Sequence, residues 1–140
     1  MKKLLLIPVL GIGMISSAVA NPTIIEKVNE KAQKYNIPGN FAQAVIKTES
    51  KYNPMVRGSR GEIGLGQILC PTAKGVGFKG KCDQLYHADT NLEYSMKYLK
   101  LALDKANGNQ CHAATLYAGG LDRKPRSSAY CKKVMANKID

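Results

Sequence analysis

Residues 41–67 read FAQAVIKTESKYNPMVRGSRGEIGLGQ, and the interpretation of the whole chain depends on this stretch. Its first half carries apolar residues at helical spacing and ends at a single carboxylate, Glu49. Pro54 restricts the residue before it and so ends the predicted helix. The second half alternates glycine with charged residues, and glycine allows positive φ angles and close approach of the backbone. We therefore predict a helix that carries Glu49 and is followed by a structured loop or a short β-hairpin.

Glu49 is the strongest candidate for a catalytic group. It lies at the edge of the helix's apolar face, where a carboxyl group is partly desolvated and its pKa is raised. A carboxylic acid that is protonated near neutral pH can donate a proton to a leaving oxygen. The simpler alternative is a solvated glutamate at a helix end, which the glycine-rich segment, Gln67 and Tyr117 disfavour. Gln67 offers an amide to a sugar, and Tyr117 offers a hydroxyl either to Glu49 or to a substrate.

The first twenty residues have the pattern of a secretory signal peptide. Two lysines precede an apolar run over residues 4–15, and residues 18–20, AVA, are typical of a cleavage site. The apolar run is shorter than the ~20 residues of a membrane span, which disfavours a membrane anchor. We expect residues 1–20 to be removed as a signal peptide, and residues 21–140 to form one domain in the periplasm or outside the cell.

The predicted domain is strongly basic. Two of the 21 lysine and arginine residues lie in the signal peptide, so 19 basic and 10 acidic residues remain, a net charge of +9. A basic exported protein suggests an anionic partner such as a cell-wall polymer, a membrane surface or nucleic acid, although the charge could serve solubility alone. The predicted compartment and the lack of a nucleic-acid-binding motif disfavour nucleic acid.

Four cysteines lie in the predicted domain: Cys70, Cys82, Cys111 and Cys131. An even number of cysteines in an exported protein predicts two disulfides. Three pairings are possible, and we favour the sequential one, Cys70–Cys82 and Cys111–Cys131, because it closes short loops. A zinc site is the alternative, but no CxxC spacing supports it and neither histidine has a ligand-like arrangement with the cysteines.

The other segments predict helices and almost no β-structure. Residues 23–26, TIIE, have capping-box spacing at the start of a first helix. Residues 92–103 carry leucine and methionine at three- and four-residue steps, which indicates an amphipathic helix. One of the two serines at 127–128 starts a last helix, which includes Tyr130. Only residues 61–70 carry a β signal, so the predicted fold class is mostly α.

Four short motifs follow one another at defined spacing. Glu49-Ser50 is followed by Gly64-Leu65-Gly66-Gln67, whose first glycine stands fifteen positions after the glutamate. Pro71-Thr72-Ala73 and Asp89-Thr90-Asn91-Leu92 come next, and the alanine-rich segment 113–120 ends in LYAGG. Each motif alone is short. Together and in this order they resemble the Slt-type lytic transglycosylases, and the resemblance covers most of the predicted domain.

The resemblance implies a lysozyme-like α+β fold, with a short β-hairpin or loop after the catalytic helix, and an enzyme that cleaves the glycan strands of peptidoglycan. Glu49 would protonate the glycosidic oxygen between N-acetylmuramic acid and N-acetylglucosamine. It would then take the proton from the muramic C6 hydroxyl, which attacks the anomeric carbon and forms a 1,6-anhydro ring. Ser50, Ser59, Gln67 and Tyr117 would bind the substrate, and neither a cofactor nor a metal is expected.

The chain departs from the family pattern at a few positions. Gly66 stands where the family usually has methionine, which should open the wall of the sugar groove. Ala118 and Gly119 stand in place of the usual asparagine and alanine, which removes a polar group beside the tyrosine. Ser59 lies one position later than the family's loop serine. These differences concern contacts with the substrate and leave Glu49 in register.

Two other functions remain open at this point. A muramidase would use water and a second carboxylate at a distance of about 5–9.5 Å, for which Glu62, Asp83 and Asp89 are the nearby candidates. A non-catalytic, basic wall-binding module would explain the charge alone. We expect a monomer that acts on glycan strands, and its size suggests local wall opening for an envelope assembly such as a secretion system, flagellum or pilus.

Overall fold

The computed structural model describes residues 21–140 together with Gly11, so the predicted signal peptide, apart from Gly11, lies outside the described residues. The described elements in chain order are α1 (Ile24–Lys34), α2 (Gly39–Ser50), α3 (Cys70–Gly75), the 3₁₀ helix η1 (Cys82–Tyr86), α4 (Ala88–Lys105), α5 (Gln110–Gly119) and α6 (Ala129–Ala136). None of the helices in this part of the chain combines the length and the hydropathy that a bilayer span requires. The mostly α fold that the sequence predicts is confirmed.

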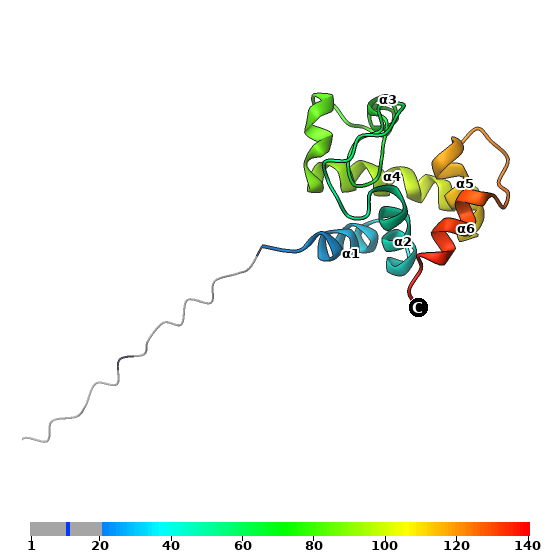
Figure 1. Cartoon of the computed structure of the whole chain (residues 1–140), viewed down its shortest axis with the longest axis horizontal. Helices are drawn as coiled ribbons and strands as arrows, with labels where there is room; N and C mark the ends of the chain where they lie inside the picture. Colours follow the sequence, from blue (N-terminus) through cyan, green and yellow to red (C-terminus); the bar gives the residue numbers. More distant parts are fainter. Residues whose placement is uncertain (1–10, 12–20) are drawn as a thin grey trace, which may run out of the picture.

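The larger of two hydrophobic cores is built by five helices. α4 runs through the middle of the molecule, with α1 and α2 on one side of it and α5 and α6 at its far end (Figure 1). The largest fully buried side chains of this core are Phe41, Ile46, Leu65, Leu92, Met96, Leu99 and Leu116, of which Leu65 comes from the loop after α2. Burying side chains of this size contributes most of the stability of a small domain. The core therefore holds the C-terminal end of α2, and with it Glu49, in a fixed position.

A smaller core lies under the segment between α2 and α4. Its buried side chains include Ile63, Ile68, Phe78 and Leu85. Residues 51–69 form no named strand and contain only two isolated antiparallel bridges, Arg57 with Ile63 and Ile63 with Ile68. Of the two forms that the sequence allowed, this segment is thus a structured loop with minimal β-pairing.

Asn91 on α4 holds this loop against the helix. Its side chain is fully buried and donates to the carbonyl oxygens of Ile63 and Leu85, both at 2.8 Å. It accepts from the backbone N–H of Gly66 at 2.8 Å. A Cβ atom at Gly64, where φ is +70°, would lie 2.6 Å from the Asn91 amide nitrogen, so only glycine fits there. One buried amide thereby satisfies backbone groups that the irregular loop leaves unpaired.

The caps and disulfides agree with the sequence. Thr23 and Glu26 form the expected capping box at α1. Ser128 is the serine that caps α6, since its hydroxyl accepts from the backbone N–H of Cys131. The sequential cysteine pairing is confirmed, with Cα–Cα distances of 5.6 Å for Cys70–Cys82 and 5.0 Å for Cys111–Cys131. The first disulfide closes the smaller core, and the second joins α5 to α6.

Candidate active site

Glu49 lies at the wall of a cavity of about 390 Å³ between the two cores. The end of α2 supplies Glu49, the loop supplies Glu62 and Gln67, the end of α5 supplies Tyr117, and the start of α6 supplies Tyr130. Four segments of the chain therefore contribute side chains to the wall of one cavity. The sequence predicts that Glu49 lies at the edge of an apolar face of α2, and in the structure this edge borders the cavity.

The surroundings of Glu49 favour its protonated form. Burial raises the pKa of its carboxyl group, a hydrogen bond from Tyr130 lowers it, and the nearby charge of Glu62 raises it, so that the pKa stands at about 7. A carboxyl group with this pKa carries a proton on a large share of molecules at neutral pH and can also give it up. These are the properties of a general acid that later acts as a base.

Within the described residues, Tyr130 is the one hydrogen-bond partner of the Glu49 carboxyl group, and its hydroxyl donates to Oε1. Burial and the neighbouring Glu49 carboxylate both raise the pKa of the Tyr130 phenol, so it stays protonated and remains a donor. The sequence placed Tyr130 only within a last helix and did not identify it as a site residue. The local sequence shows only a tyrosine in the first turn of a capped helix. A tyrosine in that position can equally be a packing residue or a site residue.

Tyr117 lines the cavity but does not form the hydrogen bond to Glu49 that the sequence allowed. Its hydroxyl instead donates to the carbonyl oxygen of Gly66 at 2.6 Å, and the side chain is only 8% exposed. Its ring packs at a tilt against Tyr98, with the centroids 5.5 Å apart. Tyr117 therefore fixes the loop at Gly66 and also forms part of the cavity wall.

The structure also corrects the expectation for Gly66. The absence of a side chain does not open the groove, because Gly66 is buried and the space beside it is filled. A Cβ atom there would lie 2.8 Å from the Tyr117 hydroxyl oxygen and closer still to the Ser95 side chain. Gly66 is thus required for close approach of the loop backbone to α4 and α5.

Of the other predicted substrate-binding residues, Gln67 lines the cavity and the two serines do not. The Gln67 amide donates to the carbonyl oxygens of Val56 and Gly64, at 3.0 and 2.9 Å, and so holds its own loop. Ser50 is buried, because its hydroxyl turns back along α2 to the carbonyl oxygen of Ile46 at 3.1 Å. Ser59 is exposed on the loop and is not part of the cavity wall.

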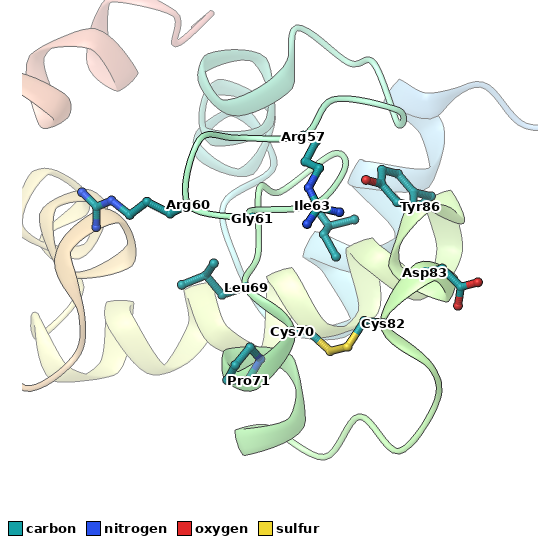
Figure 2. Close-up of a pocket in the computed structure, with 10 residues that line it drawn as sticks. All are labelled: Arg57, Arg60, Gly61, Ile63, Leu69, Cys70, Pro71, Cys82, Asp83 and Tyr86. Carbon is teal, nitrogen blue, oxygen red and sulfur yellow. A yellow bond between two sulfur atoms is a disulfide. The ribbon is translucent and has the colours of Figure 1, made fainter.

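The three candidate second carboxylates lie in different places. Glu62 lines the same cavity as Glu49. Asp89 forms an ion pair with Lys27 of α1 at 2.9 Å. Asp83 lines a neighbouring cavity of about 460 Å³, together with Tyr86 and the Cys70–Cys82 disulfide. Figure 2 shows that second cavity, where the Arg60 side chain extends away from the disulfide; Arg60 is part of the lining of both cavities. Only Glu62 therefore shares a cavity with Glu49.

No group of three or more histidine, cysteine, aspartate or glutamate side chains in the described part of the chain is placed to hold a metal ion. All four cysteines are in disulfides. The polar groups that line the Glu49 cavity are carboxyl and phenol groups together with the side chains of Arg60, Gln67 and Thr72.

Solved structures with this fold come from larger enzymes. Lytic transglycosylase Slt from Pseudomonas aeruginosa, solved as an inactive mutant, matches with a TM-score of 0.65 and 20% identity over 79% of this chain. The 70-kDa soluble lytic transglycosylase SLT70 from Escherichia coli matches with a TM-score of 0.62 and 24% identity over 78% of this chain. A complex of the 70-kDa soluble lytic transglycosylase with bulgecin A gives a TM-score of 0.66 and 24% identity over 79% of this chain.

These matches cover 20%, 18% and 18% of the solved chains, so this chain corresponds to about a fifth of each enzyme's length. They establish the lysozyme-like fold. The sequence model of the Transglycosylase SLT domain matches residues 26–139, which is most of the chain. The order of motifs from Glu49 to the LYAGG segment, the fold and this match lead to one conclusion: the protein belongs to the Transglycosylase SLT domain family.

Proposed function

We propose that this protein is a lytic transglycosylase that cleaves the β-1,4 bond between N-acetylmuramic acid and N-acetylglucosamine in peptidoglycan. The observation that carries the proposal is Glu49, which lies at the wall of a cavity with its pKa raised to about 7 and a tyrosine hydroxyl on its carboxyl group. Membership of the family supports the choice of substrate.

The reaction needs only one carboxyl group. Protonated Glu49 donates its proton to the glycosidic oxygen, and the bond to the anomeric carbon of the muramic residue breaks. The resulting carboxylate takes the proton from the muramic C6 hydroxyl, whose oxygen attacks the anomeric carbon and closes the 1,6-anhydro ring. Because Tyr130 donates to Oε1, the second carboxyl oxygen is the one free to carry the transferred proton. A pKa of about 7 suits both steps at neutral pH.

Gln67 and Tyr117 are the predicted substrate-binding residues that line the cavity, and we propose that they contact the sugars. The Gln67 side-chain carbonyl is not used by the two hydrogen bonds that its amide makes within the loop, so it can accept from a sugar hydroxyl. Ser50 and Ser59 would need a rearrangement of α2 or the loop to reach the same space.

One specific observation favours a second reaction. Glu62 lines the Glu49 cavity, so a muramidase that activates water with Glu62 is the alternative. The products separate the two, because transglycosylation leaves anhydro ends whereas hydrolysis leaves reducing ends that are one water heavier. We expect wild-type protein and Glu62→Gln to release anhydro muropeptides from purified peptidoglycan, and Glu49→Gln to release none. Reducing ends from wild type that disappear in Glu62→Gln would establish the muramidase.

We also propose that the chain acts outside the cytoplasm, as a monomer, where it opens the wall locally for an envelope-spanning assembly. The signal-peptide pattern of residues 1–20, the two disulfides and the proposed wall substrate support this. N-terminal sequencing of the exported protein should begin at Asn21, and light scattering should give the mass of one chain. A pull-down from envelope extracts that recovers no assembly component would contradict the role in an assembly.

A further inference from the structure

Tyr130, which donates to Glu49, is followed directly in the chain by a cysteine in a disulfide. Cys131 is 1% exposed, and its sulfur is bonded to Cys111 in the first turn of α5. The Cα atoms of the two cysteines are 5.0 Å apart. The backbone beside the phenol is therefore tied covalently to a helix whose other end also lines the cavity.

Apart from the disulfide, this end of α6 is held by Tyr130 and Cys131, which pack in the larger core, and by one side-chain hydrogen bond. Residues 122–127, which lead into it, are exposed throughout. The Ser128 hydroxyl lies 2.7 Å from that of Thr115 on α5, which is a single hydrogen bond. The other end of the helix is held separately, by Val134 in the larger core and by the Asn137 amide, which donates to Thr48 on α2 at 3.0 Å. The disulfide is thus the covalent cross-link that joins the turn carrying Tyr130 to α5.

The second disulfide provides an internal comparison. Cys70–Cys82 joins α3 to η1 beside the smaller core, and neither cysteine is next to a residue that hydrogen-bonds Glu49. The two bonds close loops of similar length, with sequence separations of 12 and 20 residues. Loop-closure arguments therefore give them similar effects on the unfolded chain. If removal of one disulfide lowers activity more than removal of the other, the cause is therefore where each disulfide lies in the fold.

We propose that the Cys111–Cys131 disulfide is a positioning element for the catalytic carboxyl group: it holds Tyr130 against Glu49, and glycan cleavage depends on its being oxidised. This inference rests on the proposed function and adds a requirement to it. Reduction by an external phosphine adds two electrons and two protons to the bond, gives two thiols, and converts the phosphine with water into its oxide. The turn before Tyr130 is then free to move, and Glu49 loses its oriented donor.

The test compares C111A/C131A, C70A/C82A, Tyr130→Phe and the combined Tyr130→Phe/C111A/C131A variant in the full chain. We expect Tyr130→Phe to lower kcat on purified peptidoglycan about thirtyfold, and C111A/C131A to lower it about tenfold with KM within about twofold. C70A/C82A should keep kcat within about twofold. The combined variant should be no slower than Tyr130→Phe alone, because both changes remove the same interaction.

The pKa of Glu49, measured by carboxyl ¹³C NMR, provides a readout that loss of stability alone would not move. The hydrogen bond from Tyr130 lowers this pKa, so we expect it to rise in C111A/C131A and in Tyr130→Phe but not in C70A/C82A. If C111A/C131A does not fold, as judged by circular dichroism, phosphine reduction of folded C70A/C82A protein breaks only the remaining disulfide and should give the same loss and the same shift.

Two results would overturn the inference. In the first, C111A/C131A has the same kcat and the same Glu49 pKa as C70A/C82A. In the second, the reduction of kcat in the combined variant equals the product of the reductions in Tyr130→Phe and in C111A/C131A. If wild-type protein releases no glycan product, the proposed function fails, whereas the NMR titration still decides whether the disulfide positions Tyr130.

Discussion

Glu49 and Glu93 are both partly buried glutamates that accept a hydrogen bond from a tyrosine, yet their pKa values lie on opposite sides of the ordinary value. At Glu49, burial dominates and raises the pKa to about 7. At Glu93 on α4, burial also raises the pKa, but hydrogen bonds from Lys34, Tyr35 and Lys31 outweigh it and lower the pKa to about 2.

The difference between the two sites lies in the ammonium groups. Lys31 and Lys34 on α1 approach the Glu93 carboxylate to 3.0 and 2.8 Å, and so make it a permanent anion that joins α1 to α4. Among the described residues that line the Glu49 cavity there is no lysine, and the one arginine, Arg60, makes no ion pair with Glu49. A buried carboxyl group that is hydrogen-bonded only by a tyrosine can therefore gain and lose a proton near neutral pH. A carboxyl group that also pairs with two lysines stays ionised there.

The largest expected effect is on stability at high pH. The pKa of Glu49 is about 7 in the folded chain against an ordinary value of 4.5, so its stabilising contribution is complete below pH 4.5 and is lost as the pH rises through 7. Keeping the charged form buried above pH 7 costs about 3 kcal/mol. We expect Glu49→Gln to exceed wild type by about 3 kcal/mol in the free energy of unfolding at pH 8 and by little at pH 4, measured with urea. An equal difference at both pH values would contradict a raised pKa.

Removing the tyrosine hydroxyl should separate the roles of Tyr130 and Tyr117. Tyr130→Phe should raise the pKa of Glu49 and lower kcat by an amount equivalent to about 2 kcal/mol, because it removes the hydrogen bond to the carboxyl group. Tyr117→Phe leaves the buried Gly66 carbonyl without its donor, so it should cost about 1 kcal/mol of stability while the Glu49–Tyr130 pair stays intact. Kinetics and urea unfolding of both variants check this, and a larger pKa shift in Tyr117→Phe would reverse the assignment.

Thr72→Lys should move Glu49 toward the behaviour of Glu93. Thr72 lines the Glu49 cavity, and an ammonium group there favours the charged carboxylate. We expect the pKa of Glu49 to fall by about one unit, which moves the high-pH limb of the kcat/KM profile to lower pH and costs about tenfold in activity at pH 8. Thr72→Met has similar length without charge and serves as the control. A shift of the same size in Thr72→Met, or one that 0.5 M salt leaves unchanged, would mean that charge is not the cause.

Glu93→Gln should have the smallest effect and none on catalysis. The pKa of Glu93 is lowered, so its contribution to stability is present above pH 4.5 and is lost as the pH falls through about 2. Because Lys34 is half exposed, solvent screening reduces that contribution, and we expect a loss of about 1 kcal/mol at pH 7. Urea unfolding at pH 7 and pH 2 measures this loss. Altered kcat in Glu93→Gln would show that the α1–α4 contact influences the active site.

Some of the site could be predicted from local sequence, and some could not. The position of Glu49 followed from helical periodicity, since a residue at the edge of an apolar stripe enters a cleft if one is present. Tyr130 and Tyr117 are thirteen positions apart, and both are tyrosines on short helices near the C-terminus. Nothing local indicates which of them contacts Glu49. The choice depends on how α5 and α6 pack, and there the phenol of α6 approaches Glu49 while that of α5 approaches Gly66.

The amino-acid sequence by itself determined the helical class, the cap at Thr23 and the catalytic candidate, because each depends on neighbours or on spacing along the chain. It favoured the sequential pairing of the cysteines and limited the cap of the last helix to Ser127 or Ser128, and the structure decided both. Only the tertiary structure decided that the side chains of Ser95 and Tyr117 occupy the space beside Gly66, and that Asn91 supports the loop. It also decided that the carboxyl groups of Glu49 and Glu93 differ in charge at neutral pH. Burial and long-range hydrogen bonds set these properties, and both come from residues that are distant in sequence.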